Sequence, residues 1–259
     1  MLHLVRCGSA AGDPPYDIWM THTPTGSIRD GLTGLGPEIH ERYSYCGDSM
    51  SMYTHCGTHI DTLNHLGHCG MFWNGWKEET QLGSRHWRVG GADKYPPIIA
   101  RGVLIDVAGA HGVDCLPPSY AIGPDELKKV ASSQGTEIRT GDVVLIRTGR
   151  MNVWPDYDGY LRNSPGIDLP ACKYLCEEAG AMCIGSDTIG VEVMPFTEKD
   201  SFLPVHAYMF STAGAQIIEV CQLEELAAAK QYEFAFMGFP LKLVGATGSP
   251  FRPICVPLK

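Results

Sequence analysis

Short apolar runs and amphipathic stretches alternate along the second half of the chain. Three of the runs have the length and composition of buried strands: residues 103–107, 143–147 and 181–185. The stretch at residues 124–134 begins with Pro124 and two acidic residues and is followed by Gly135, which predicts a helix. Residues 169–179 form a second amphipathic stretch and stop before Gly180. This alternation predicts crossover connections and a sheet that is at least partly parallel.

The C-terminal part continues the alternation. We expect one helix after Pro204 and another at residues 223–230. Strands are expected at four apolar runs: residues 216–220, 233–239, 241–244 and 252–256. Residues 1–50 are rich in Gly, Pro, Ser and Thr without a sustained period, which indicates loops and short strands. The sequence therefore predicts one compact α/β domain over residues 1–259, with a mixed β-sheet core, flanking helices and a loop-rich N-terminal segment at residues 1–42.

Composition narrows the class of protein. The 259 residues are 44% hydrophobic and 19% charged, which is typical of a soluble globular protein. The net charge of −9 and the scattered Lys and Arg residues argue against nucleic acid as a partner. No apolar run approaches the roughly 20 residues that span a bilayer, and the chain does not begin like a signal peptide. We expect a cytoplasmic protein without a membrane partner.

Ten cysteines would suit a disulfide framework in a secreted protein. Half of them instead lie within apolar patterns, where a reduced thiol packs as a small hydrophobic group: Cys172, Cys176, Cys183, Cys221 and Cys255. Buried free thiols are therefore the favoured interpretation.

Three histidines fall within the eleven residues from His55 to His65 (His-Cys-Gly-Thr-His-Ile-Asp-Thr-Leu-Asn-His). In an extended strand, positions 55, 57, 59 and 61 project to one side, which would gather His55, His59 and Asp61 around an ion. Gly57 would then leave room between the ligands. Two imidazoles and one carboxylate leave coordination positions open, as a catalytic metal site requires. Zn²⁺, Mn²⁺ and Fe²⁺ all suit this set, and the alternative is a histidine-rich loop without a metal.

Residues close to this run extend the candidate site. His65 is interpreted as a ligand of a second ion, a partner of a ligand or a proton carrier, and the alternative is a packed histidine. The aromatic residues Phe72, Trp73 and Trp76 would wall an apolar pocket for a flat substrate, although aromatic packing in the core is the competing interpretation.

At these residues the chain resembles the metal-dependent cyclase superfamily, which includes bacterial kynurenine formamidases, isatin hydrolases and trans-dienelactone hydrolases. Its hallmark, His-x-Gly-Thr-His-x-Asp-x-x-x-His, is matched from His55 to His65, with Leu63 at the position of a usual proline. Further segments resemble the family in order: residues 101–106, 141–149, 164–166, 185–188 with Glu192, and 245–250. The resemblance covers residues 43–259 and implies a cyclase-like fold of the swivelling β/β/α type. From the residues alone, Arg147 and Asp187 are interpreted as structural, and residues 245–250 as a turn before the last strand.

The resemblance also implies a second constellation, a histidine followed by a glycine and then a glutamate, which matches His206 and Glu219 here. In relatives with two metals, the counterparts of His65, His206 and Glu219 hold the second ion. With one metal they act as acid/base and positioning groups. The resemblance therefore implies one or two divalent ions, Zn²⁺ or Mn²⁺, and a homodimer or homotetramer.

These features predict a metal-dependent hydrolase that cleaves a lactone, cyclic amide or amide bond of a small, cyclic or aromatic molecule through a metal-activated water. Within the family that the chain resembles, the spacing of His206 and Glu219 is similar to that of the dienelactone-hydrolase branch, so the resemblance favours this type over the alternative, an arylformamidase. Two histidines and one carboxylate also describe non-heme iron oxygenases, which usually place one histidine far along the chain. A catalytically inactive metal-binding homologue would lack His65, His206 or Glu219, and all three are present.

Overall fold

A computed structural model describes residues 16–31, 34 and 36–258. The chain divides into two compact units, residues 1–56 and residues 57–259, which we describe separately.

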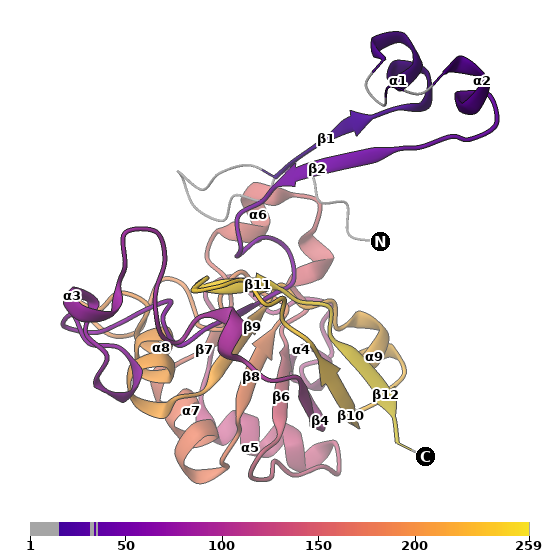
Figure 1. Cartoon of the computed structure of the whole chain (residues 1–259). Helices are drawn as coiled ribbons and strands as arrows, with labels where there is room; N and C mark the ends of the chain where they lie inside the picture. Colours follow the sequence, from indigo (N-terminus) through magenta and orange to yellow (C-terminus); the bar gives the residue numbers. More distant parts are fainter. Residues whose placement is uncertain (1–15, 32–33, 35, 259) are drawn as a thin grey trace. The chain divides into compact units, whose positions relative to one another are not determined.

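The first unit contains an antiparallel hairpin with two short helices between its strands (Figure 1). Its elements are β1 (Asp17–His22), α1 (Pro24–Asp30), α2 (Pro37–His40) and β2 (Gly47–Ser51). The short strands confirm the prediction for this region, whereas the helices were not predicted. A local signal for α1 exists, because the Oγ1 of Thr23 accepts a hydrogen bond from the Gly26 N–H and Pro24 opens the helix.

The second unit is built on an eight-stranded sheet in the order β11-β3-β9-β8-β6-β4-β10-β12 (Figure 1). The four central strands are parallel and the outer pairs are antiparallel. The strands are β3 (His59–Asp61), β4 (Ile98–Asp106), β6 (Val143–Arg147), β8 (Cys183–Ser186), β9 (Gln216–Glu219), β10 (Glu233–Gly238), β11 (Gly248–Pro250) and β12 (Ile254–Pro257). A separate parallel pair joins β5 (Ala121–Ile122) to β7 (Gly166–Ile167). This architecture confirms the predicted α/β class and the mixed sheet.

Helices and helical turns connect these strands. The α-helices of the second unit are α3 (Glu78–Gln81), α4 (Val107–Ala110), α5 (Pro124–Ser133), α6 (Tyr157–Leu161), α7 (Leu169–Lys173), α8 (Pro204–Tyr208) and α9 (Glu224–Ala228). Both α7 and α8 continue into π-helical turns, over Tyr174–Glu178 and Met209–Ala213. The predicted helices at residues 124–134, 169–179, 223–230 and after Pro204 are therefore confirmed.

Alternate residues of the central strands face two separate cores, as the twofold period of a strand requires. On one face, Val103 and Ile105 of β4 pack in a cluster with Leu127 of α5, Leu175 beyond α7 and Met209 beyond α8. On the other face, a second cluster holds the intervening residues together with C-terminal aromatic side chains: Leu104, Val143, Leu145, Phe234, Phe236 and Phe251. The sheet is thus buried on both faces, which holds the ends of its strands in fixed positions.

Two sequence predictions in the C-terminal region are wrong. Residues 241–244 form no strand, and Leu241 and Val244 are 49% and 64% exposed. The carbonyl of Leu243 accepts hydrogen bonds from the N–H groups of Asp93 and Ala246. The backbone here therefore makes loop hydrogen bonds and does not pair with a neighbouring strand. The strand comes later, at β11, where a turn was expected.

The structure also bears on the predictions for the cysteines and for membrane-spanning segments. The cysteines of the described part are free thiols, and Cys172, Cys183 and Cys221 are buried. Within the described ranges, no helix combines the length and apolar character needed to cross a membrane.

Candidate metal centre

The candidate site forms where β3 and β9 lie side by side. These strands are antiparallel, and their register places His59 opposite Glu219 and Asp61 opposite Ile217. His59 and Asp61 are two residues apart on β3, so their side chains project to the same face. His206, in the first turn of α8, brings a third segment to this face.

Two groups of side chains have the composition and spacing of metal ligands. The ligand atoms of His55, His59 and Asp61 lie within 4.8 Å of one another, and so do those of Asp61, His206 and Glu219. All five residues are buried. Asp61 belongs to both groups, and its two carboxylate oxygens give it the means to serve both.

The route by which His55 reaches this group differs from the sequence prediction. The strand begins only at His59, and His55 lies in a turn at the end of the first unit. Gly57 has φ +63°, a left-handed conformation that favours glycine. The strand interpretation is therefore correct for His59 and Asp61 but wrong for residues 55–58, and Gly57 supports a turn.

The two central histidines are oriented through their Nδ1 atoms. The Nδ1 of His59 lies 2.8 Å from the carbonyl oxygen of Gly57, and donation to this oxygen directs Nε2 toward the carboxylates. That Nε2 is 3.2 Å from both Asp61 Oδ1 and Glu219 Oε2. His206 contacts Glu192 through Nδ1, and its Nε2 is 2.9 Å from Glu219 Oε1 and 3.7 Å from Asp61 Oδ2.

The carboxylates control the charge of these histidines. Burial alone lowers the pKa of His59, but Asp61 and Glu219 outweigh burial and raise that pKa to about 10. Burial also opposes a charge on His206, yet Glu192 and Glu219 hold its pKa well above the usual value. The pKa of Glu219 is lowered, because hydrogen bonds from the two imidazoles exceed the opposing effects of burial and Asp61. Positive charge is therefore strongly favoured at this point of the protein.

A divalent metal ion fits this arrangement. Asp61, Glu192 and Glu219 are three buried carboxyl groups, and burying such groups is costly without compensating positive charge. Protons on His59 and His206 supply that charge when no cation is bound, and an ion coordinated by the Nε2 atoms would replace them. Imidazole nitrogen and carboxylate oxygen are ligands for Zn²⁺ and Mn²⁺.

His65, predicted for the second ion, lies beside this group. Its Nε2 is 3.7 Å from Asp61 Oδ2, and its side chain is 25% exposed. Its ring centroid is 6.0 Å from that of Phe210. The compact second group therefore consists of Asp61, His206 and Glu219. His65 lies next to this group and is more exposed than its members.

The three aromatic residues after the cluster lie in different surroundings. Phe72 packs against Trp87 with ring centroids 4.5 Å apart. Trp73 lies against Gly214, where a Cβ atom would come within 2.5 Å of the indole. Trp76 borders a cavity of about 360 Å³ whose lining also includes Leu63, Arg88, Val89, Gly90, Lys94, Tyr95, Pro96 and Gln216.

Glu192 is a site residue whose role was not predicted. Its carboxylate accepts hydrogen bonds from the backbone N–H groups of Val205 and His206 and also contacts the His206 ring. The available signal was an acidic residue between Val191 and Val193, because a glutamate inside an apolar run is rarely buried without a specific partner.

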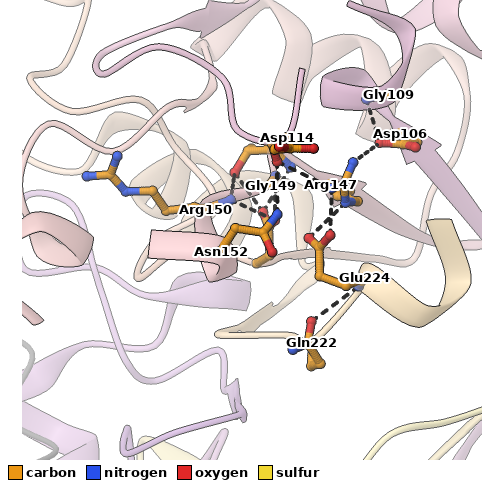
Figure 2. Close-up of polar contacts among 11 residues, drawn as sticks. Asp106, Gly109, Asp114, Arg147, Gly149, Arg150, Asn152, Gln222 and Glu224 are labelled. Carbon is orange, nitrogen blue, oxygen red and sulfur yellow. Dashed lines mark hydrogen bonds and ion pairs between the residues drawn. The ribbon is translucent and has the colours of Figure 1, made fainter. Parts of the chain in front are cut away.

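Arg147 and Asp187 have structural contacts, as the sequence suggested. Figure 2 shows Arg147 between the carboxylates of Asp106 and Glu224. Its Nη1 lies 2.8 Å from Asp106 Oδ1, and its Nε and Nη2 form a bidentate pair with Glu224. Asp187 accepts hydrogen bonds from the backbone N–H groups of Thr148, Gly149 and Arg150. These contacts join the carboxyl ends of neighbouring strands to the loops that follow them.

Comparisons with known proteins agree with this fold. The kynurenine formamidase of Geobacillus thermodenitrificans (strain NG80-2) is 29% identical over 203 residues, or 78% of this chain and 76% of the relative. The crystal structure of a novel cyclase has a TM-score of 0.81 at 25% identity and covers 97% of this chain and 85% of that chain. Isatin hydrolase A from Ralstonia solanacearum has a TM-score of 0.68 at 21% identity, covers 93% of this chain and 81% of that chain, and shares the fold.

A family model described as Cyclase matches residues 12–193. The match contains the run from His55 to His65 and also Glu192, while His206 and Glu219 follow it in the chain. Since more than half of the sequence is matched, the chain belongs to the Cyclase family.

Proposed function

We propose that the protein is a metal-dependent hydrolase that cleaves a lactone, cyclic amide or amide bond of a small cyclic or aromatic molecule. The observation that carries the proposal is the pair of buried ligand groups that share Asp61. A structural metal site is usually closed by four protein ligands, whereas each of these groups offers three and leaves room for water or substrate.

In this proposal His55, His59 and Asp61 hold the first ion, and His206 and Glu219 complete a second group with Asp61. A bound divalent ion supplies an activated water and polarises the carbonyl of the substrate. The protein positions the remaining groups. His65 is suited to proton transfer because its Nε2 lies 3.7 Å from Asp61 while its side chain is partly exposed. It would accept a proton at Nε2 and return it to the leaving nitrogen or oxygen.

The names of the relatives support hydrolysis of an amide. One relative is a kynurenine formamidase, and the similar folds include an isatin hydrolase bound to the product analogue thioisatinate. Isatin is a cyclic amide of an aromatic amine, and a formamidase acts on an open-chain amide. The kynurenine formamidase match favours an arylformamidase as the second candidate function, whereas the spacing of His206 and Glu219 favours a cyclic substrate.

In this proposal, Trp76 makes apolar contact with the aromatic ring of the substrate. Trp76 borders the 360 Å³ cavity, and Leu63 in the same lining is two residues beyond Asp61. Phe72 and Trp73 would act more indirectly, through their packing against Trp87 and Gly214.

A substrate panel tests the proposed reaction. Purified protein would be supplied with Mn²⁺ or Zn²⁺ under anaerobic conditions and offered an aryl lactone, isatin and an N-formyl aromatic amine. We expect one of these bonds to be hydrolysed without oxygen, and the preferred compound separates the cyclic substrates from the arylformamidase alternative. Turnover that requires oxygen would support an oxygenase. Bound metal without turnover of any compound would support the inactive homologue.

A further inference from the structure

We infer that Glu192 is a positioning residue that fixes the orientation and tautomer of His206, and that it thereby sets the affinity of the Asp61–His206–Glu219 group for a divalent cation. The inference rests on the proposed metal site but not on the identity of the substrate. It gives a role to Glu192, a buried acidic residue that takes no direct part in the proposed hydrolysis.

Glu192 holds both the backbone and the ring of His206. Its Oε1 accepts the backbone N–H of His206 at 3.2 Å and also contacts Nδ1 of the same residue. Its Oε2 accepts the N–H of Val205 at 3.2 Å. Both N–H groups belong to the first turn of α8, where no earlier carbonyl in the helix is available to accept them. One carboxylate therefore fixes the start of the helix and the imidazole that the helix carries.

This arrangement determines which nitrogen of His206 faces the ligand group. An ionised carboxylate accepts hydrogen bonds and donates none, so Nδ1 of His206 keeps its proton, and Nε2 is the nitrogen at which a cation would replace one. Nε2 is then directed to Glu219 Oε1 at 2.9 Å and Asp61 Oδ2 at 3.7 Å. A carboxylate behind a ligating histidine also increases the basicity of the ligand. At His59, Nδ1 instead faces the neutral carbonyl of Gly57.

The position of Glu192 is itself fixed by a close backbone contact with β7. Ile167 bridges Glu192, and the N–H groups of Ile167 and Val193 donate to the carbonyls of Val191 and Ile167. A Cβ atom at Gly166 would lie 2.4 Å from the Glu192 carbonyl carbon, so a side chain there requires the backbone to move. This contact gives a physical reason for glycine in the 164–166 segment. It predicts that Gly166 acts on His206 through Glu192.

Four variants test the inference. Glu192→Gln retains the shape of the side chain but removes its charge, and Gly166→Ala displaces its backbone. The matched control for the first is Asp187→Asn, because Asp187 is also fully buried and accepts backbone N–H groups, but from the loop after β6. The control for the second is Gly123→Ala, where the nearest atom to a Cβ is 3.7 Å away.

Two measurements are made on each folded variant. In ¹⁵N-imidazole-labelled protein without metal, wild type should show a strongly deshielded proton on Nδ1 of His206, assigned with the His206→Gln variant. Glu192→Gln should lose this signal. Calorimetric titration with Zn²⁺ should show about 10- to 100-fold weaker binding of the affected ion in Glu192→Gln and a smaller loss in Gly166→Ala. Asp187→Asn and Gly123→Ala should keep both the signal and the affinity.

The inference is overturned if the Nδ1 signal and the Zn²⁺ affinity of Glu192→Gln equal those of wild type. It is also overturned if Asp187→Asn weakens Zn²⁺ binding as much as Glu192→Gln, since the effect would then be a general loss of a buried carboxylate. Failure of the hydrolysis panel with these results intact would refute the proposed reaction and leave the role of Glu192 in place.

Discussion

His59 and Glu219 lie opposite each other in the register of β3 and β9, with Nε2 and Oε2 3.2 Å apart. The strand pairing thus joins a candidate ligand from the run His55–His65 to a carboxylate from a distant part of the chain. A second contact, from His206 Nε2 to Glu219 Oε1, places the same carboxylate between two imidazoles. This pairing joins the two ligand groups into one site and leads to the following predictions.

The two groups should lose their ions separately. His55→Ala removes a ligand of the first group and should abolish both the first ion and activity. Glu219→Ala removes a ligand of the second group and should spare the first ion. Metal content per chain, measured by plasma mass spectrometry after dialysis, checks both expectations. Full metal retention in His55→Ala would contradict the assignment of His55.

Metal binding should release protons and strengthen as the pH rises. The folded, metal-free His59 has a pKa of about 10, so it carries a proton at neutral pH that coordination through Nε2 must displace. Calorimetry in buffers of different ionisation enthalpy measures the release. Binding that is equally tight from pH 6 to pH 9, with no proton released, would disagree with this prediction.

The stability of the metal-free protein should have the opposite dependence on pH. His59 has a folded pKa above its ordinary value of 6.5, so its stabilisation is fully present below pH 6.5 and is lost as the pH rises toward about 10. Thermal unfolding of the metal-free protein between pH 6 and pH 9 tests this sign, with metal-free His59→Gln as the control that should lose this contribution.

Gly57→Ala should destabilise the site. The positive φ of Gly57 costs a residue with a Cβ about 1–2 kcal/mol, and relaxation of the turn would move the carbonyl that orients His59. We expect a lower unfolding temperature and weaker metal binding. Gly57→Asn is the matched variant, because asparagine adopts this conformation more readily, and it should lie between wild type and Gly57→Ala. Identical behaviour of all three proteins would argue against the turn.

Arg147→Met should destabilise the fold without removing the metal ligands. The Arg147 side chain is 8% exposed, and its loss leaves Asp106 and Glu224 without their shared cation, at a cost of about 3–5 kcal/mol (Figure 2). Arg139→Met is the control, since Arg139 and its partner Glu137 are largely exposed and should contribute little. Urea unfolding monitored by tryptophan fluorescence compares the two variants. Equal stability would show that the buried pair is not required.

Much of the fold was predictable where local pattern and burial agree. Residues 143–147 are buried between two layers, and the apolar run at residues 143–146 followed by Arg147 identified β6 with its observed bounds. Residues 241–244 are similarly apolar, yet the loop contacts of the Leu243 carbonyl exclude them from the sheet, and a local pattern contains no information on such partners. β3 has only three residues, and the local pattern did not separate this short strand from the turn at residues 55–58 before it.

The candidate site was predictable in its residue types but less so in its geometry. His59 and Asp61 share a face because they are two apart on a strand, which the sequence indicates directly. The contact of Glu219 with His59 depends on the register of two strands distant in the chain. The contact of Glu192 with His206 depends on the packing of α8. The resemblance supplied His206 and Glu219, but neither it nor the local pattern identified Glu192 as the partner of His206.

The most direct test of the central claim is the divalent metal content of natively purified wild type and Asp61→Asn. Asp61 belongs to both ligand groups, so the account predicts one or two ions per chain in wild type and none retained stoichiometrically in folded Asp61→Asn. Wild-type protein without stoichiometric divalent metal, or Asp61→Asn with the full wild-type content, would contradict it.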